Sequence, residues 1–362
     1  MTTTAVLRLL NYGLPGLRSA GERAAEAFSP NELAASPLAL DAPPADLSGD
    51  VDASSENDWR ETSPDGDLHL LERPWPGLHA PLYLAGHATS SLDVAQALAH
   101  RNLLPEWGAV LVLAQSAGRG QLRRAWASPP GNIYAALRLP TAWPLNTEAA
   151  ATAVGGLFAS ALTQLGYAVS LKWPNDILQV QNEEFSTSPD GASVRPCSAT
   201  AWVKAGGILL EERGGVLLAG VGLNISSAPP ASALREGFAL PAGVLRHAPA
   251  PPPAPAVDHT GIQTGFIPLL PLWTRLAGLV FSCYFQKNIG TETSWWPALA
   301  QRHLAFHGCR VRLEDALPEH DSGAERSFCE GVVEGLCVSG ALRLRVKSDV
   351  LTFLGGSLIP LE

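Results

Sequence analysis

The chain has 362 residues, of which 46% are hydrophobic and 16% charged, as in a globular protein with room for about two domains. Its formal net charge of −9 argues against binding nucleic acid or anionic lipid, because such surfaces need clustered lysine and arginine. No stretch approaches the roughly 18 apolar residues that cross a bilayer, and the N-terminus lacks the basic start and apolar run of a signal peptide. We therefore expect no membrane association and a cytoplasmic location.

Residues 1–81 are expected to be an extension that is partly disordered. A helix-like patch covers residues 5–28, and residues 36–67 are rich in Pro, Ala, Ser and acidic side chains. A DNA-binding helix-turn-helix needs a recognition helix with exposed basic residues after a short turn, and none can be placed here. We therefore expect no DNA partner.

From residue 82 the pattern becomes that of a compact region with both helices and strands. A capped helix and a buried strand come first, and the strand enters a loop rich in Gly and Arg. Two later strands form a hairpin through Arg213, Gly214 and Gly215. In chain order, we expect a helix at 90–100, strands at 108–115 and 132–139, a helix at 147–166, and strands at 168–176, 202–212 and 215–225.

The remaining chain contains two irregular inserts, two helices and a small all-β unit. The inserts, 181–201 and 226–263, are polar or rich in Pro and Ala, as surface excursions are. Helical patterns follow at 268–288 and 293–303. Four short alternating segments after Gly308 predict a small β-barrel of about 55 residues.

The five cysteines form no C-x-x-C pair, and their number is odd. We expect reduced thiols, with a bond between Cys329 and Cys337 in a late hairpin as the alternative. The other three are Cys197, Cys283 and Cys309.

The densest chemical motif is the loop Gln115–Trp126, directly after a predicted buried strand. Its glycines allow close backbone approach to a ligand and expose N–H groups to anions, and its arginines add positive charge. This composition favours a phosphate or carboxylate ligand. A flexible, solvated basic loop is the alternative for this segment alone.

Three further segments carry candidate ligand groups. Lys172–Asp176 reads KWPND, which fits either a ligand-holding turn or an ordinary Asx turn. Lys204 precedes paired glycines in an apolar strand, so it either snorkels to the surface or points at a buried anion. In Gly220–Asn224 the glycines indicate close backbone approach, and Asn224 fits a turn as well as a ligand contact.

Taken in order, and together with His87–Ser91, these segments resemble those of the biotin protein ligase family. The resemblance covers roughly residues 82–225, and the chain's end is similar to the family's small C-terminal barrel. It implies an α+β fold: a class II synthetase-like, biotin/lipoate ligase catalytic domain with a mixed β-sheet flanked by helices, then an SH3-like barrel. The implied domains are 82–305 and 306–362.

The resemblance also implies a two-step reaction. Biotin's carboxylate attacks the α-phosphorus of ATP, giving biotinyl-5'-adenylate and pyrophosphate, and a lysine of a biotin carboxyl carrier protein then takes the biotinyl group. The carrier would belong to acetyl-CoA carboxylase or another biotin-dependent carboxylase. Both steps place negative charge in one site, so preorganised cationic and N–H donors matter most. ATP and Mg²⁺ are the implied cofactors, no protein-held metal site is expected, and a homodimer is common in the family.

Matching the motifs position by position assigns the site residues. Arg119 and Lys204 would stabilise the developing charge, and Asp176 would help to organise Mg-ATP. Hydroxyl and amide side chains suit biotin's ureido ring, and an indole offers adenine a stacking surface. The biotin contacts implied are Thr89, Ser90, Gln115, Gly118, Arg119 and Gly120; the remaining cofactor contacts are Gln121, Arg124, Trp126, Asn175, Lys204, Gly206 and Asn224.

Three positions depart from the family pattern. Gln121 and Arg123 stand where an arginine and a glycine are usual, so we expect weaker retention of the adenylate unless Arg123 or Arg124 substitutes. Ser90 stands where asparagine is usual, which removes an amide but keeps a hydroxyl. Two other functions stay open: a lipoate or octanoate protein ligase or transferase of the same fold, and a catalytically weak biotin-binding regulatory protein.

Overall fold

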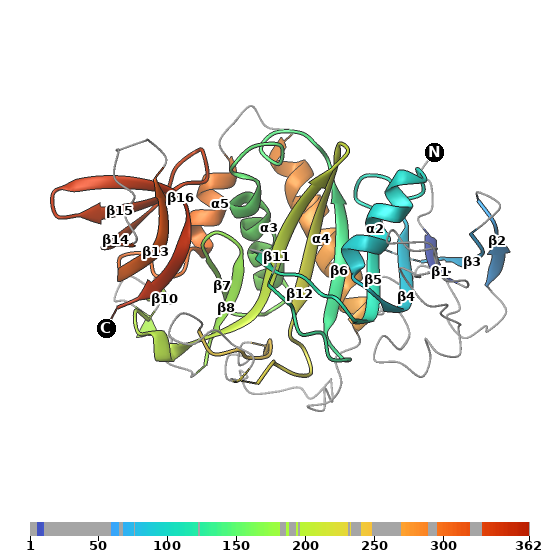
Figure 1. The fold of residues 1–362 in the computed structure, drawn as a ribbon, viewed down its shortest axis with the longest axis horizontal. Coiled ribbons are helices and arrows are strands. Elements are labelled where there is room, and N and C mark those ends of the chain that lie inside the picture. The colour runs from blue at the N-terminus through green and yellow to red at the C-terminus, as the bar shows by residue number, and fades with distance from the viewer. Residues whose placement is uncertain are drawn as a thin grey trace, which may run out of the picture.

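The computed structural model describes residues 6–10, 59–64, 68–75, 77–121, 124–181, 186–187, 193–194, 196–230, 232, 240–247, 269–288, 295–318 and 328–361. A large twisted sheet with helices on both faces occupies most of the molecule, and a small barrel lies beside one end of it (Figure 1). Across these ranges, no helix combines the length and apolar character needed to cross a membrane.

The large sheet has ten strands in the order β2-β3-β1-β4-β5-β6-β12-β11-β8-β7. The β1–β4 and β4–β5 pairs are parallel and the other pairs are antiparallel, so the sheet is mixed as expected. The strands are β1 Val6–Leu10, β2 Arg60–Thr62, β3 Leu70–Pro74, β4 Leu82–Ala88, β5 Ala109–Gln115, β6 Ile133–Leu139, β7 Val169–Lys172, β8 Asp176–Val180, β11 Trp202–Arg213 and β12 Val216–Leu223.

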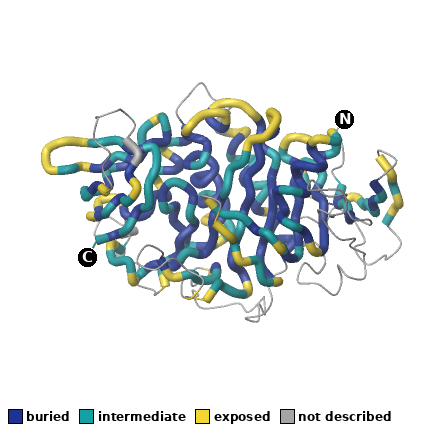
Figure 2. The backbone as a smooth tube through the Cα atoms, in the orientation of Figure 1, coloured by how far each residue is buried: buried dark blue, intermediate teal, exposed yellow. Residues whose placement is uncertain are grey.

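Helices cover the two faces of this sheet unequally. Helix α2 (Ser91–His100) packs on one face, and α3 (Ala150–Gln164), α4 (Leu269–Asn288) and α5 (Trp295–His303) pack on the other. Within β5, Leu111 joins the α3–α5 core, whereas its neighbours Val110 and Val112 join the α2 core. This follows from the two-residue side-chain period of a strand, which makes a doubly covered strand apolar throughout. Figure 2 shows the sheet buried along most of its length.

The four late segments form a closed barrel, β13-β14-β15-β16, as predicted. Its strands are β13 Arg310–Pro318, β14 Phe328–Leu336, β15 Leu342–Val346 and β16 Asp349–Pro360. The barrel is fastened to the sheet region at the turn before β15, where Gly340 O accepts hydrogen bonds from Trp173 Nε1 (2.8 Å) and Thr152 Oγ1 (3.3 Å). Trp173 belongs to the KWPND segment, so this motif contacts the barrel directly.

The N-terminal extension departs from the sequence prediction. Val6–Leu10 lies in the patch that was expected to be helical, but it forms strand β1 between β3 and β4. Arg60–Thr62 lies in the stretch expected to be disordered, but it pairs with β3. These segments become strands because they pair with strands that are distant in the sequence, and a local sequence pattern does not show which distant strands will pair with it. The expected domain boundary at residue 82 thus falls inside the sheet. The remaining parts of the two predicted segments, residues 11–28, 36–58 and 65–67, lie outside the described residues.

The insert at 181–201 is only partly described, and two elements are seen in it. Strands β9 (Ser186–Thr187) and β10 (Ser193–Val194) pair with each other, and a 3-10 turn, η3 (Ala199–Ala201), leads into β11. The insert at 226–263 is described only at 226–230, 232 and 240–247, where Ala242 bridges to Lys204 of β11.

The expectation of reduced cysteines was wrong for two residues. Cys197 and Cys309 form a disulfide with a Cα–Cα distance of 5.4 Å and a sequence separation of 112 residues. The bond joins the end of the first insert to the turn before β13. Beside it, Trp202 at the start of β11 makes an edge-on contact with Phe306 of that turn. Sequence spacing could not show that these cysteines meet, because the barrel's docking brings them together.

Candidate active site

A cavity of about 430 Å³ opens where the large sheet meets the barrel. Its walls come from the loop after β5, the turn between β7 and β8, strands β11 and β12, and Gly356–Leu358 of β16. Most residues expected at the site line this cavity: Ser90, Gln115, Arg119, Gly120, Gln121, Arg124, Trp126, Asn175, Asp176, Lys204 and Asn224. Gly118 and Gly206 stand just behind its wall, close to residues that line it, and Thr89 directly precedes the lining residue Ser90.

The loop after β5 folds back on itself as a narrow hairpin. The Gly120 N–H donates to Arg124 O (2.8 Å) and the Trp126 N–H to Gly118 O (2.8 Å). A Cβ on Gly118 would lie 2.6 Å from Trp126 O, so only glycine lets the two arms approach this closely. Gln121 is exposed near the hairpin tip, and Arg123 lies outside the described residues, so its ability to replace the missing arginine stays a prediction.

The returning arm places the Trp126 indole on a floor made by two glycines. Gly207 of β11 and Gly222 of β12 are opposite each other in the strand register, and a Cβ on either would meet the ring, at 3.3 Å and 2.7 Å respectively. Trp126 Nε1 is buried and has no hydrogen-bond partner in the described part of the chain. The ring also lies 5.4 Å from Lys204 Nζ, so indole and ammonium face the same space.

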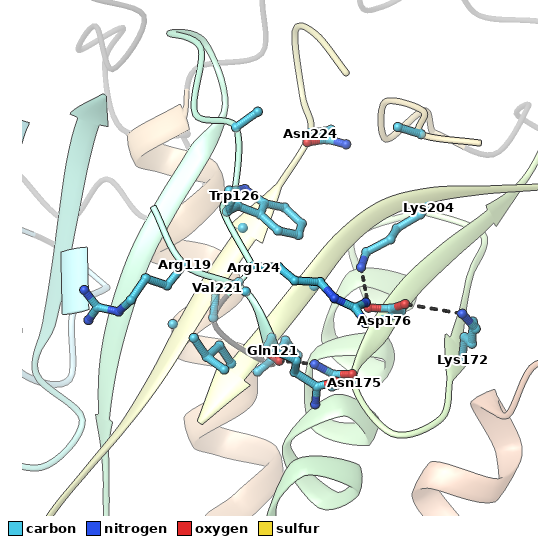
Figure 3. Close-up of a pocket in the computed structure, with 18 of the residues that line it drawn as sticks. Arg119, Gln121, Arg124, Trp126, Lys172, Asn175, Asp176, Lys204, Val221 and Asn224 are labelled. Carbon is cyan, nitrogen blue, oxygen red and sulfur yellow. Dashed lines mark hydrogen bonds and ion pairs between the residues drawn. The ribbon is translucent and has the colours of Figure 1, made fainter. Parts of the chain in front are cut away.

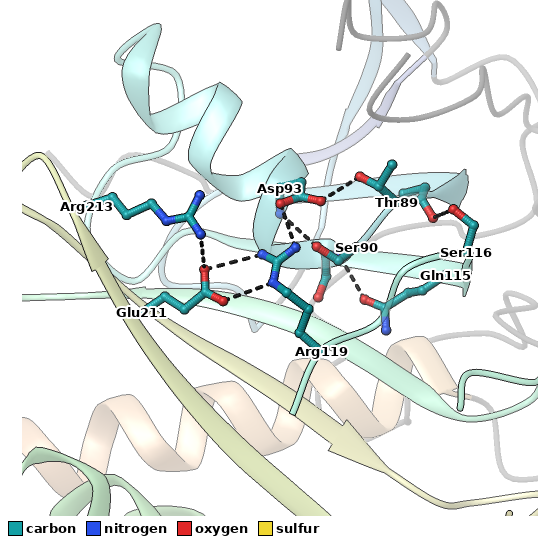
Figure 4. A network of polar contacts seen from close by, with 10 residues as sticks. Thr89, Ser90, Asp93, Gln115, Ser116, Arg119, Glu211 and Arg213 are labelled. Carbon is teal, nitrogen blue, oxygen red and sulfur yellow. Dashed lines mark hydrogen bonds and ion pairs between the residues drawn. The ribbon is translucent and has the colours of Figure 1, made fainter. Parts of the chain in front are cut away.

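Arg119 is held by two carboxylates (Figure 4). Its Nη1 lies 2.9 Å from Asp93 Oδ1 of α2, and its Nε lies 3.0 Å from Glu211 Oε1 of β11. Thr89 Oγ1 donates to the second oxygen of Asp93 (2.7 Å). Burial by itself raises the pKa of Asp93, but the Thr89 hydrogen bond and the Arg119 charge outweigh it and hold the pKa below its usual value. Arg119 thus ties the loop hairpin to α2 and β11.

The start of α2 and the loop are joined by side chains expected to contact biotin. Ser90 caps the helix, because its hydroxyl accepts from the Asp93 N–H (3.1 Å). Gln115 Oε1 accepts from the Ser91 N–H (2.8 Å), and its Nε2 donates to Ser128 Oγ (2.9 Å). Ser90 and Gln115 line the cavity while fixing the wall around it.

At the other part of the cavity, three cationic side chains surround one carboxylate (Figure 3). Lys204 Nζ lies 2.6 Å from Asp176 Oδ1, Lys172 Nζ lies 3.6 Å from Asp176 Oδ2, and Arg124 points toward the same carboxylate. Burial by itself raises the pKa of Asp176, but Lys204 and Lys172 together hold it below the usual value. Burial lowers the pKa of Lys172, with the Lys204 charge adding to this effect and Asp176 opposing it.

The two asparagines expected near the nucleotide are anchored to backbone carbonyls. Asn175 Nδ2 donates to Ile208 O (2.5 Å), and Asn224 Nδ2 donates to Gly243 O (3.0 Å). Both residues are almost fully buried, so their amide groups hold the turns beside the cavity in place. Each amide keeps its carbonyl oxygen and one N–H for a contact with a ligand.

The cavity walls do not fit a protein-held Mg²⁺. Asp176 is the one acidic residue among those that line the cavity, and two lysines already engage it. The described ranges also contain no cluster of three or more His, Cys, Asp or Glu side chains that could hold a metal ion. A magnesium ion in a nucleotide site is held by one or two carboxylates together with phosphates and waters, and a carboxylate already paired with two lysines is a poor ligand for it. Mg²⁺ therefore stays an expectation tied to ATP, since the described residues around the cavity offer it no free carboxylate.

Sequence reasoning missed three side chains that organise the site. Lys172 begins the KWPND segment and could have been noticed as a second cation in that motif. Asp93 and Glu211 carried no signal, because an acidic residue in the first turn of a helix or at the end of a strand is ordinary. Only the folded chain brings them to Arg119.

Comparison with known proteins places these features in a family. A profile of the biotin/lipoate A/B protein ligase family matches residues 90–225. A biotin–acetyl-CoA-carboxylase ligase of Paracoccus denitrificans is 31% identical over 249 residues, which is 65% of this chain and 83% of the relative. This chain belongs to the biotin protein ligase family.

Solved structures support the same fold. The biotin protein ligase of Aquifex aeolicus in complex with biotin and ATP superposes with a TM-score of 0.50 at 19% identity, over 76% of this chain and 97% of that one. A point mutant of that protein in complex with biotin gives 0.52 at 18% identity, over 76% and 96%. The α+β catalytic fold followed by a small barrel, expected of a biotin protein ligase, is thus confirmed.

Proposed function

We propose that this protein activates biotin with ATP to form biotinyl-5'-adenylate and pyrophosphate, and then transfers the biotinyl group to a lysine of a biotin carboxyl carrier protein. The observation that carries the proposal is the cationic part of the cavity, where Lys204, Lys172 and Arg124 lie around Asp176. Membership in the biotin protein ligase family, a relative named for ligation to acetyl-CoA carboxylase, and a fold relative bound to biotin and ATP support it.

The chemistry asks the protein mainly for charge stabilisation. When the biotin carboxylate attacks the α-phosphorus, negative charge spreads over the phosphoryl oxygens and pyrophosphate leaves. Lys204 and Arg124 line the cavity, whereas Arg119 is held by two carboxylates and Lys172 is less exposed, so we assign Lys204 and Arg124 to this charge. In the second step the carrier amine attacks the biotinyl carbonyl and AMP leaves, which places charge on the same oxygens.

The remaining expected residues receive positioning or binding roles. Ser90, Gln115 and the loop glycines would bind biotin, and the Trp126 ring would stack on adenine. Arg119, to which the family resemblance assigned charge stabilisation, would instead act by holding the loop hairpin on Asp93 and Glu211, because both carboxylates already pair with it. A carboxyl carrier protein is the proposed partner, and the expected cytoplasmic location, homodimer and lack of DNA binding remain predictions.

Biotin-dependent exchange of radiolabelled pyrophosphate into ATP tests the first half-reaction. We expect exchange with biotin and none with lipoate, which separates this function from a lipoate ligase of the same fold. Lys204→Ala should lower exchange by about 100-fold, the size of effect found when one preorganised charge-stabilising donor is removed. Lys347→Asn is the matched control, since Lys347 is an exposed lysine in the β15–β16 turn.

The outcomes separate three possible functions. Biotin binding without exchange would replace the enzyme with a biotin-binding protein. Exchange with lipoate alone would make it a lipoate ligase. Exchange with biotin should be followed by transfer of labelled biotin to a purified carrier domain, which tests the second half-reaction.

A further inference from the structure

One carboxylate in the cavity is shared by two lysines from different strands. Lys172 ends β7 and Asp176 begins β8, so this pair closes a tight hairpin, while Lys204 reaches the same carboxylate from β11. Each lysine has its own oxygen: Lys204 takes Oδ1 at 2.6 Å and Lys172 takes Oδ2 at 3.6 Å. One lysine can therefore move away from Asp176 while the other stays paired with it.

The two lysines differ in how far they can move. The side chain of Lys172 is 11% exposed and that of Asp176 19%, whereas that of Lys204 is 33% exposed. Lys204 Nζ lies over the Trp126 ring, 5.4 Å from its centroid, and Lys172 lies beside the turn between β7 and β8. A ligand that enters the cavity can thus reach Lys204 more readily than Lys172.

A largely buried carboxylate such as that of Asp176 does not readily give up its only cation. Breaking a buried ion pair by removing one partner leaves an uncompensated charge, which is strongly unfavourable. If Asp176 had Lys204 alone, an anionic ligand would have to compete with Asp176 for that lysine. Because Lys172 is also present, Asp176 stays paired when Lys204 turns to the ligand.

We infer that Lys172 is a positioning residue that keeps Asp176 paired and so releases Lys204 to the anionic centre of the bound nucleotide or acyl adenylate. This inference rests on the proposed function, because it assumes that the ligand carries a phosphate. Asp176 then acts as the resting partner of Lys204. It does not contact the reacting atoms, which differs from the role in holding Mg-ATP that the family resemblance implied.

The test is a set of binding measurements on the full chain. Wild type, Lys172→Met, Asp176→Asn and the double variant would be titrated calorimetrically with ATP, with a stable biotinyl-adenylate analogue and with uncharged adenosine. Lys172→Met should weaken both anionic ligands by about tenfold, within the range of coupling between contacting charged groups. Adenosine affinity should change less than about twofold, because adenosine does not need Lys204.

The double variant decides between positioning and mere structural support. Removing Asp176 in the Lys172→Met background frees Lys204 again, so we expect anion affinity to recover to within about threefold of wild type. A double variant that binds ATP no better than Lys172→Met would overturn the inference. Equal weakening of ATP and adenosine in Lys172→Met would overturn it too, because it would show a distorted site.

The wild-type protein separates this inference from the proposed function. If it binds ATP and the analogue but catalyses no pyrophosphate exchange, the proposed reaction fails while the binding comparison still tests Lys172. If it binds neither anionic ligand, both ideas are refuted together. Lys347→Asn, which removes an exposed lysine that does not line the cavity, should match wild type in every titration.

Discussion

Gly222→Ala should damage ligand binding by moving the Trp126 indole. A Cβ at position 222 would lie 2.7 Å from two indole carbons and 2.8 Å from the indole nitrogen, against about 3.4 Å for an ordinary contact. The ring would therefore have to move by roughly 0.7 Å. The backbone of β12 cannot retreat instead, because it pairs with β11 on one side and β6 on the other.

Over-packing of this kind costs about 1–3 kcal/mol. If the whole cost appears in binding, the affinity for a ligand that stacks on Trp126 falls by about 5- to 150-fold. Calorimetric titration with ATP measures this fall, and thermal unfolding shows how much of the cost is expressed in stability instead. The loss of ATP affinity and the loss of stability, both expressed as free energies, should add up to the cost of over-packing.

Gly278→Ala in α4 is the matched control. Its nearest neighbour would lie at 3.5 Å, an ordinary contact, and alanine is the better helix former, so we expect unchanged ATP affinity. The reasoning about Trp126 is refuted if Gly222→Ala binds ATP within about twofold of wild type and unfolds at the same temperature.

Three further predictions concern the network and the covalent link. Arg119→Lys should speed hydrogen exchange of the loop amides, because one ammonium cannot bridge both Asp93 and Glu211; unchanged exchange would remove the anchoring role. Asp93→Asn should cost about 1–2 kcal/mol at pH 7, a difference that shrinks as the pH falls below about 4. The direction of this pH dependence follows from the lowered pKa of Asp93: the ionised carboxylate stabilises the fold above its unfolded pKa, and this stabilisation is lost when the carboxylate is protonated. Urea unfolding at pH 7 and at pH 3 measures the difference between Asp93→Asn and wild type. Replacing Cys197 and Cys309 by serine should lower the free energy of unfolding by up to about 5 kcal/mol, because the disulfide closes a loop of 112 residues in the unfolded chain. A reductant should lower the stability of the wild type by a similar amount and leave that of the variant unchanged.

Local pattern was enough to predict most of the elements that carry the site. The continuous apolar run of β5 indicates a strand that is covered on both faces, and α3 has the small-residue pattern of a helix. The glycine pair between β11 and β12 indicates a hairpin, because both glycines adopt positive φ in the turn. The order of the motifs also predicted the family, which the comparison with the Paracoccus denitrificans relative bears out.

Contacts between distant segments could not be predicted in this way. Val6–Leu10 has no strand character of its own beyond a few apolar residues, and it becomes a strand because β3 and β4 pair with it. The Cys197–Cys309 bond and the Gly340 contact with Trp173 exist because the barrel docks beside the KWPND turn.

The sequence by itself determined which side chains belong to the site, because their chemistry and order are local properties of the chain. Only the tertiary structure decided how they pair: Arg119 with Asp93 and Glu211, and Asp176 with Lys172 and Lys204. The physical reason is that an ion pair depends on distance in space. A strand register and a helix packed across the sheet set that distance, and neither is written in the spacing of residues along the chain.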